Sequence, residues 1–274
     1  MKLTRIIDKI LNSLTWLFAG LALLALGFII VHILMNGIPH LSRTLFAFRW
    51  TPDNVSMLPA IFNTLFIVVI TLVLAVPLGI FTGIYLVEYT KKGSRLVKFI
   101  RTATELLAGI PSIVYGLFGM LFFVQFMGVG ISVLAGSLTL SIMVLPLVIR
   151  TTEEALKTVA EGYREGSFAL GAGKLRTIFR IVIPSAMPGI FAGVILAIGR
   201  IVGESAALIL TTGTVPQMAG GLFNSGRTLS IHMWSLSGEG HHINQAYATA
   251  VVLLIFVFII NALSALVAKK LTKR

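Results

Sequence analysis

The sequence predicts an all-α membrane protein with six transmembrane helices and with both termini in the cytoplasm. Composition is the first reason, because 57% of the 274 residues are hydrophobic and only 12% are charged, against roughly 45–50% and about 25% in soluble domains. Hydropathy is the second reason, since six apolar stretches each approach the ~20 residues that a spanning helix needs. The stretches cover residues 14–35, 61–87, 110–127, 129–149, 189–211 and 246–268.

The distribution of basic residues predicts the orientation. Most of the 22 Lys and Arg residues lie in four segments, residues 2–9, 91–101, 150–180 and 269–274. The exceptions are Arg43, Arg49 and Arg227 in the alternate connections and Arg200 inside a span. Because cytoplasmic loops carry the excess of Lys and Arg, this pattern puts both termini inside. The net charge of +12 therefore reflects membrane topology, and we expect no nucleic-acid partner.

These features divide the chain into three parts. Residues 1–60 form a first span and an external loop, residues 61–268 form a core with five spans, and residues 269–274 form a basic cytoplasmic tail. The first apolar run is longer than the 7–15 residues of a signal-peptide core, so we interpret it as a span. Cysteine is absent, which excludes disulfides and thiolate metal sites.

Proline and glycine interrupt several of the apolar stretches. Pro77, Pro111 and Pro146 lie in or at the edges of spans, where the missing backbone donor must be compensated by neighbouring groups. Such breaks are common in transporters, but proline also kinks membrane helices that have no special function.

The longest cytoplasmic connection, residues 151–184, has helix-forming composition and predicts short helices broken at Gly171 and Gly173. Its sequence Glu165-Gly166-Ser167, followed after three residues by Gly171 and after nine more by Ile181-Val182-Ile183-Pro184, resembles the loop E-A-A-x3-G-x9-I-x-L-P of bacterial ABC importer permeases. Gly166, Ser167 and Ile183 depart from that pattern by small or apolar replacements.

The resemblance implies a type I ABC importer permease fold, with residues 61–268 as its core and with a cytoplasmic coupling helix around residues 161–170. We call residues 151–184 the coupling loop. By resemblance, Glu165 is a polar anchor to an ATPase subunit or to the second short helix, Gly171 is the tight turn and Pro184 starts the fifth span. The open alternative is an amphipathic helix on the lipid surface, favoured by the basic residues Arg164, Lys174, Arg176 and Arg180.

ATP hydrolysis is expected outside this chain. Gly173-Lys174 superficially resembles a P-loop, but G-x-x-x-x-G-K-[ST] requires glycine at Phe168 and Ser or Thr at Leu175. We therefore expect no catalytic residues and no cofactor here, with ATP and Mg bound by the partner ATPase subunit that the resemblance implies.

Arg200 and Glu204 are charged residues within the predicted fifth span, and charges inside a membrane are functional by default. Their i,i+4 spacing predicts one helix face and a mutual ion pair. In a translocation pathway, Arg200 would offer a fork of donors to an oxyanion, and Glu204 would hold the arginine or prevent tight trapping. Alternatively, the pair is packing glue beside the close-contact glycines Gly199 and Gly203.

The segment from Gly199 to Leu208 resembles the G-R-x-x-G-E-[ST] segment of PstA- and PstC-type phosphate permeases. Residues 107–119 and 245–250 resemble the PstA type in particular. The resemblance implies one half of a phosphate pathway in the bacterial cell membrane, with a PstC-type sister permease, two copies of a PstB-type ATPase, a PstS-type extracytoplasmic phosphate-binding protein and the lipid bilayer as partners.

Two other functions stay open. One is a permease for another oxyanion, such as phosphonate, molybdate or sulfate, because Arg200 alone does not separate these cargoes. The other is an intramembrane enzyme that uses Glu88, Glu105 or Glu204 with a histidine, although no paired carboxylates at ligand spacing support it.

The external segment 212–244 contains Arg227 and three of the five histidines, His232, His241 and His242. A binding protein could dock on such a segment. The adjacent His241 and His242 have no third ligand at clear spacing, so we expect solvated loop residues rather than a metal site.

Overall fold

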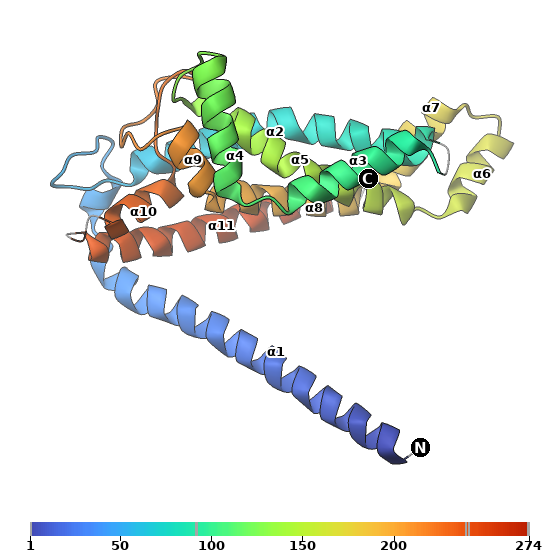
Figure 1. The fold of residues 1–274 in the computed structure, drawn as a ribbon, viewed down its shortest axis with the longest axis horizontal. Helices are drawn as coiled ribbons and strands as arrows, with labels where there is room; N and C mark the ends of the chain where they lie inside the picture. The colour runs from blue at the N-terminus through green and yellow to red at the C-terminus, as the bar shows by residue number, and fades with distance from the viewer. Residues whose placement is uncertain (1, 91–92, 239, 241, 273–274) are drawn as a thin grey trace.

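The computed structural model describes residues 2–90, 93–238, 240 and 242–272, which form helices and connecting loops without a β-strand (Figure 1). The α-helices are α1 (Lys2–Gly37), α2 (Leu58–Ile84), α3 (Arg95–Ala108), α4 (Ser112–Gly119), α5 (Val133–Lys157), α6 (Glu161–Ala169), α7 (Lys174–Thr177), α8 (Ile183–Gly203), α9 (Ala206–Thr211), α10 (Leu229–Gly238) and α11 (Ile243–Thr272). Three π-helical segments, η3 (Tyr85–Tyr89), η4 (Met120–Phe126) and η5 (Ile178–Val182), extend or join them, and two short 3₁₀ turns, η1 (Ile38–His40) and η2 (Arg43–Phe46), follow α1.

Among the described residues, five continuous helical segments are long and apolar enough to cross a membrane, and a bent pair supplies a sixth crossing if it counts as one span. The continuous segments are residues 8–40, 58–89, 133–157, 174–203 and 243–266. This confirms the all-α membrane class. It also shows that the spans begin and end at other residues than hydropathy alone predicts, since polar turns continue several helices.

The expected third span over residues 110–127 is not one straight helix. The structure contains α3 followed by α4 and η4, bent by 103° at a short break. Pro111 explains the position of the break, because proline lacks the N–H of a helical hydrogen bond and disfavours helical geometry in the residue before it. Arg95, Arg101 and Glu105 in α3 explain why the hydropathy pattern did not place the first half of this span.

The core lies where α2, α5, α8 and α11 pack side by side along the length of the bundle (Figure 1). Ile67, Leu140, Val144 and Ile201 are among the residues buried at their contacts. Close approach of α2 to α5 depends on Gly79, because a Cβ atom there would lie 2.5 Å from Cγ1 of Val148. Small residues that let two backbones approach closely are characteristic of helix packing in membranes. Lipid tails are as apolar as the side chains, so hydrophobic burial does not favour contact with a helix over contact with lipid.

Helix α1 projects away from the bundle and meets it only near its C-terminal end, beside α11 (Figure 1). Its most apolar window has no buried residues, and large side chains such as Trp16, Leu24 and Phe28 are exposed. An apolar helix of this kind is stable only where lipid or another protein covers it.

The two ends of the bundle differ in what they carry. Helices α6 and α7 cap one end, together with the ends of α2 and α5 and the start of α3, whereas α10 and the loops around residues 41–57 and 212–228 lie at the other (Figure 1). The basic segments 93–101 and 150–180 thus share an end, as the charge pattern requires. That this end faces the cytoplasm remains a prediction.

Candidate functional site

The coupling loop contains the expected short helix. Helix α6 covers Glu161–Ala169, and Gly171 follows it with a φ of +81°. Residues with a side chain rarely adopt this left-handed backbone conformation, which explains why the turn has a glycine. The Ala172 N–H donates to the Ser167 carbonyl at 3.1 Å and closes the end of the helix.

Ser167 and Glu165 lie on different faces of α6. The buried Ser167 hydroxyl shares a 2.8 Å hydrogen bond with the Thr177 hydroxyl, and this contact joins α6 to α7. Glu165 and Gly166 are exposed. Exposed apolar side chains surround them, including Tyr163 at 59% and Leu170 at 90% exposure. Such a surface, a carboxylate among apolar groups at the tip of the molecule, fits a protein partner.

The last part of the motif lies within a longer helix than expected. Ile181 belongs to η5, and Ile183 and Pro184 are the first two residues of α8. The helical segment is continuous from Lys174 to Gly203, so the fifth span does not start at Pro184. Pro184 comes directly after the π-helical turn of η5, where the α-helical hydrogen-bond pattern is already interrupted.

Arg200 and Glu204 do not share a helix face, which corrects the geometry expected from their spacing. Helix α8 ends at Gly203, and Glu204 has extended backbone angles, φ −74° and ψ 130°. Its carboxylate accepts a 3.1 Å hydrogen bond from the Ala207 N–H and so caps the first turn of α9. Among the ion pairs of the described residues, none joins Arg200 to Glu204.

Arg200 instead faces a cavity of about 130 Å³ between three helices. Thr104 and Glu105 of α3, Arg150 of α5 and Arg200 of α8 supply its polar lining. Two arginines and a glutamate from three different helices therefore line one small space, although the Arg150 guanidinium also pairs with Glu154 on the helix surface. The sequence pattern places Arg150 in a cytoplasmic loop and offers Glu105 only as a weak enzyme candidate. That both residues line one cavity with Arg200 could not be predicted, because the packing of α3, α5 and α8 leaves no signal in local spacing.

At the end of the bundle opposite the coupling loop, the side chains of His232 and Arg227 are buried. The expectation that they lie on a loop where a binding protein could dock is therefore wrong for these two residues. The Arg227 guanidinium lies 5.4 Å from the centre of the Trp50 ring, and the Asn63 side chain donates to the Arg227 carbonyl at 3.1 Å. Burial, and then the Arg227 charge, lowers the pKa of His232 from 6.5 to about 3. His242 is partly buried in a turn, and His241 lies outside the described residues.

The fold and these sites together define a membrane-spanning transport subunit, with a small charged cavity between its helices and a helical loop exposed at one end. The particular family follows from comparison with known proteins. Residues 75–273 match the family of binding-protein-dependent transport system inner membrane components. The chain belongs to this family.

Curated relatives cover most of the chain. A probable ABC transporter permease, YqgI of Bacillus subtilis, is 34% identical over 98% of both chains. The phosphate transport system permease protein PstA 1 of Mycobacterium tuberculosis is 37% identical over 78% of this chain and 71% of its own.

Solved structures share the fold. A chain of a bacterial alginate ABC transporter, crystallised with a periplasmic protein that holds an alginate pentasaccharide, matches 94% of this chain with a TM-score of 0.69 at 16% identity. A chain of the inward-facing MetNI methionine ABC transporter matches 78% with a TM-score of 0.60 at 18% identity. The expected type I ABC importer permease fold is thereby confirmed.

Proposed function

We propose that this chain forms one half of the transmembrane pathway of an ATP-driven phosphate importer. The observation that supports it best is that Arg150 and Arg200 line the same cavity in a chain 37% identical to a phosphate permease. Arginine binds tetrahedral oxyanions through paired N–H donors, and two such forks from different helices suit a small anion. Glu105 in the same cavity weakens anion binding, which helps a pathway release its cargo.

The energy comes from a separate ATPase, of which two copies of the PstB type would bind ATP and Mg. The exposed Glu165 and the apolar side chains beside it support docking of α6 on that subunit. The positive-inside rule assigns this end to the cytoplasm, where ATP is available. The alternative of an amphipathic helix on the lipid surface is weakened by Arg164, which is buried against Glu88 instead of facing lipid headgroups.

The other partners cover the remaining surfaces. A PstC-type sister permease would complete the pathway and cover the exposed apolar side chains of α1, and a PstS-type binding protein would deliver phosphate at the end that carries α10. The family name, which refers to binding-protein-dependent transport, supports the assignment of a binding protein.

Cargo is the property to test first. The complete transporter in proteoliposomes, with ATP at its ATPase subunits, should take up labelled phosphate, and excess sulfate, molybdate or phosphonate should compete weakly. Preferential uptake of one of those anions would replace phosphate as the cargo. Equal uptake with and without ATP would contradict the proposal as a whole.

A further inference from the structure

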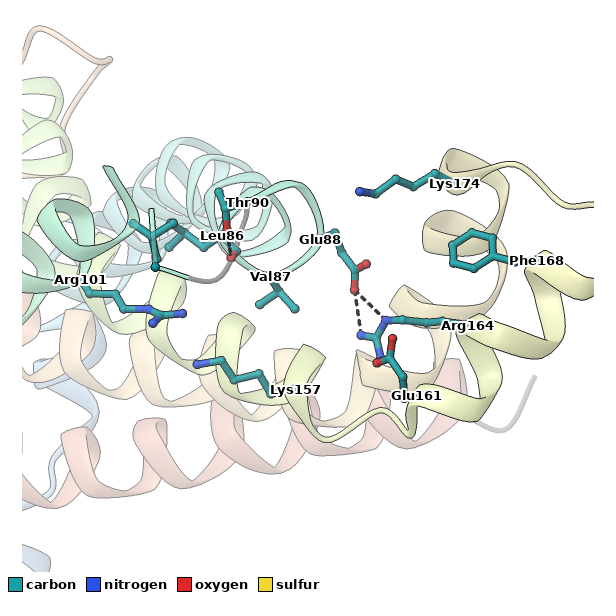
Figure 2. Close-up of a pocket in the computed structure, with 12 residues that line it drawn as sticks. Leu86, Val87, Glu88, Thr90, Arg101, Lys157, Glu161, Arg164, Phe168 and Lys174 are labelled. Atoms are coloured by element: carbon teal, nitrogen blue, oxygen red, sulfur yellow. Dashed lines mark hydrogen bonds and ion pairs between the residues drawn. The ribbon is translucent and has the colours of Figure 1, made fainter. Parts of the chain in front are cut away.

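A cleft of about 650 Å³ separates the coupling loop from the ends of α2 and α3 (Figure 2). Glu161, Arg164 and Phe168 of α6 line one wall. The opposite wall is lined by Leu86, Val87 and Glu88 of η3, which continues α2, and by Thr90. The base of the coupling loop packs on the end of α2 through a buried apolar cluster that contains Ile84, Leu156 and Ile178. Among the described residues, helix α6 contributes none to that cluster and faces the end of α2 across the cleft, so side chains that bridge the gap are its direct link to α2.

Arg164 is the main bridge, and all five N–H donors of its guanidinium have acceptors. Nε and Nη2 donate to Oε1 of Glu88 at 3.1 and 2.8 Å. Nη1 donates to the Val159 carbonyl at 2.9 Å and to Oε2 of Glu161 at 3.2 Å. Nη2 also donates to the Leu156 carbonyl at 3.1 Å. One side chain thus joins α6, the end of α5 and the end of α2.

The Arg164 and Glu88 side chains are each only 9% exposed. Separating a buried ion pair leaves two poorly solvated charges without their partner, which is costly. The guanidinium is planar, and all five of its N–H groups donate hydrogen bonds in fixed directions. Helix α6 could not slide past Glu88 without breaking several of these bonds. A displacement of α6 that keeps this ion pair intact would therefore carry Glu88 with it.

A second contact reaches the same turn of the chain. The Lys174 ammonium of α7 lies 4.7 Å from the centre of the Tyr89 ring. Glu88 and Tyr89 are adjacent in η3, where the helix widens to π geometry, a feature that is frequent at functional sites. The coupling loop thus contacts the end of α2 at two neighbouring residues from two different helices.

From these contacts we infer that Arg164 with Glu88, supported by Lys174 on Tyr89, transmits the displacement of α6 to α2 during transport. Arg164 is a positioning residue in this scheme, and the inference rests on the proposed docking of α6 on an ATPase. On the other side of the cleft, Glu153 of α5 pairs with Arg101 of α3 at 2.5 Å, so α3 is tied to α5 by a separate contact. The Arg164 bridge adds α6 to the group in which α2 already packs on α5.

The test compares Arg164→Lys and Glu88→Gln with wild type in the complete reconstituted transporter. Lysine keeps the charge but not the fork, and glutamine keeps the shape but not the charge. We expect both variants to retain the ATPase subunit and to hydrolyse ATP, while phosphate transported per ATP falls about tenfold. The double variant should be no worse than either single one, because both remove the same link.

Arg95→Lys is the matched control, since Arg95 is exposed on α3 outside the cleft, and its transport per ATP should equal wild type. A merely structural bridge would lower the yield of the complex without changing that ratio. Should the buried variants fail to assemble, Lys174→Met and Tyr89→Leu remove the second contact at exposed positions, and the ratio should still fall.

Unchanged transport per ATP in all assembled variants overturns the inference. The proposed function is tested separately by Glu165→Lys, which should detach the ATPase. Loss of the ATPase in that variant together with normal ratios in the Arg164 and Glu88 variants would overturn only the bridge. Normal coupling in Glu165→Lys would instead remove the docking role of α6.

Discussion

At the scale of single residues, Arg200 is a partly buried cation in the last turn of α8. A guanidinium in this position requires water, a counter-charge or an anion, because an isolated charge in the membrane interior is costly. The cavity supplies Glu105 as a counter-charge and Arg150 as a second cation. In the proposed pathway, Glu105 would compete with a bound anion for the two arginines, which favours binding followed by release.

Arg150 provides a sharp test of this site. It also forms an exposed i,i+4 ion pair with Glu154 at 3.0 Å, which is worth only about 0.3–0.5 kcal/mol. Arg150→Lys keeps that ion pair and loses the guanidinium fork, so we expect phosphate uptake to fall about tenfold. Glu154→Gln is the control, since it removes the ion pair and leaves the cavity lining intact. Equal uptake in both variants would assign Arg150 to the helix surface alone.

His232 predicts how stability depends on pH. In the folded protein the His232 imidazole has a pKa of about 3 and stays neutral down to about that pH. In the unfolded chain its pKa is about 6.5, so it takes up a proton below about pH 6.5. Stability is therefore fully present above pH 6.5 and declines as pH falls toward 3, by about 2 kcal/mol between pH 6.5 and 5. Thermal melting in detergent should show this decline, and His232→Met should reduce it. An identical pH profile in the variant would contradict the buried neutral histidine.

At the scale of elements, the packing of α2 on α5 sets the spacing of the core. Gly79 and Gly83 of α2 face Val148 and Thr152 of α5, and a Cβ atom at Gly83 would lie 2.7 Å from Cγ2 of Thr152. These two helices also carry Glu88 and the carbonyls that hold Arg164. Their separation therefore affects both the core and the base of the coupling loop.

We expect Gly79→Val to destabilise the protein by about 1–3 kcal/mol, the usual cost of overpacking a core. The matched control is Gly238→Ala, because a Cβ atom at Gly238 meets open space. Melting temperature and the yield of assembled complex measure the effect. A Gly79→Val variant as stable as Gly238→Ala would show that α2 and α5 can separate without cost.

Sequence alone predicts the helices better than their breaks. A long apolar run in a membrane is stable only as a helix that satisfies its own backbone hydrogen bonds. Five spans therefore follow directly from hydropathy. The bend at Pro111 and the helix end at Gly203 depend on which neighbour satisfies the backbone, which spacing does not reveal. The motif Glu165 to Pro184 correctly indicated α6 and its glycine turn, but the bridge from Arg164 to Glu88 joins residues 76 positions apart.

At the scale of the whole molecule, the chain is incomplete as a pathway. Helix α1 leaves apolar side chains exposed along its length, and the charged cavity lies within a single bundle. A sister permease, an ATPase and a binding protein would supply the missing half, the energy and the cargo. The proposed orientation agrees with this assembly, because it places the basic end of the bundle in the cytoplasm, where the ATPase would bind.

Glu165→Lys tests this assembly. Reversing an exposed charge on α6 should weaken docking of the ATPase while leaving the bundle folded, because Glu165 makes no buried contact in the described structure. Co-purification of the ATPase subunit measures docking, and Ser185→Ala, an exposed site on α8 whose hydroxyl bonds only its own helix, is the control. Full co-purification with coupled hydrolysis would contradict the docking surface.

The most direct measurement of the central claim is ATP-driven uptake of labelled phosphate by the complete transporter, with wild-type chain and with Arg200→Ala. The account predicts rapid uptake by wild type and near-complete loss in the variant, although the variant still assembles and binds its ATPase. Normal phosphate uptake by an assembled Arg200→Ala transporter would contradict the pathway through this cavity.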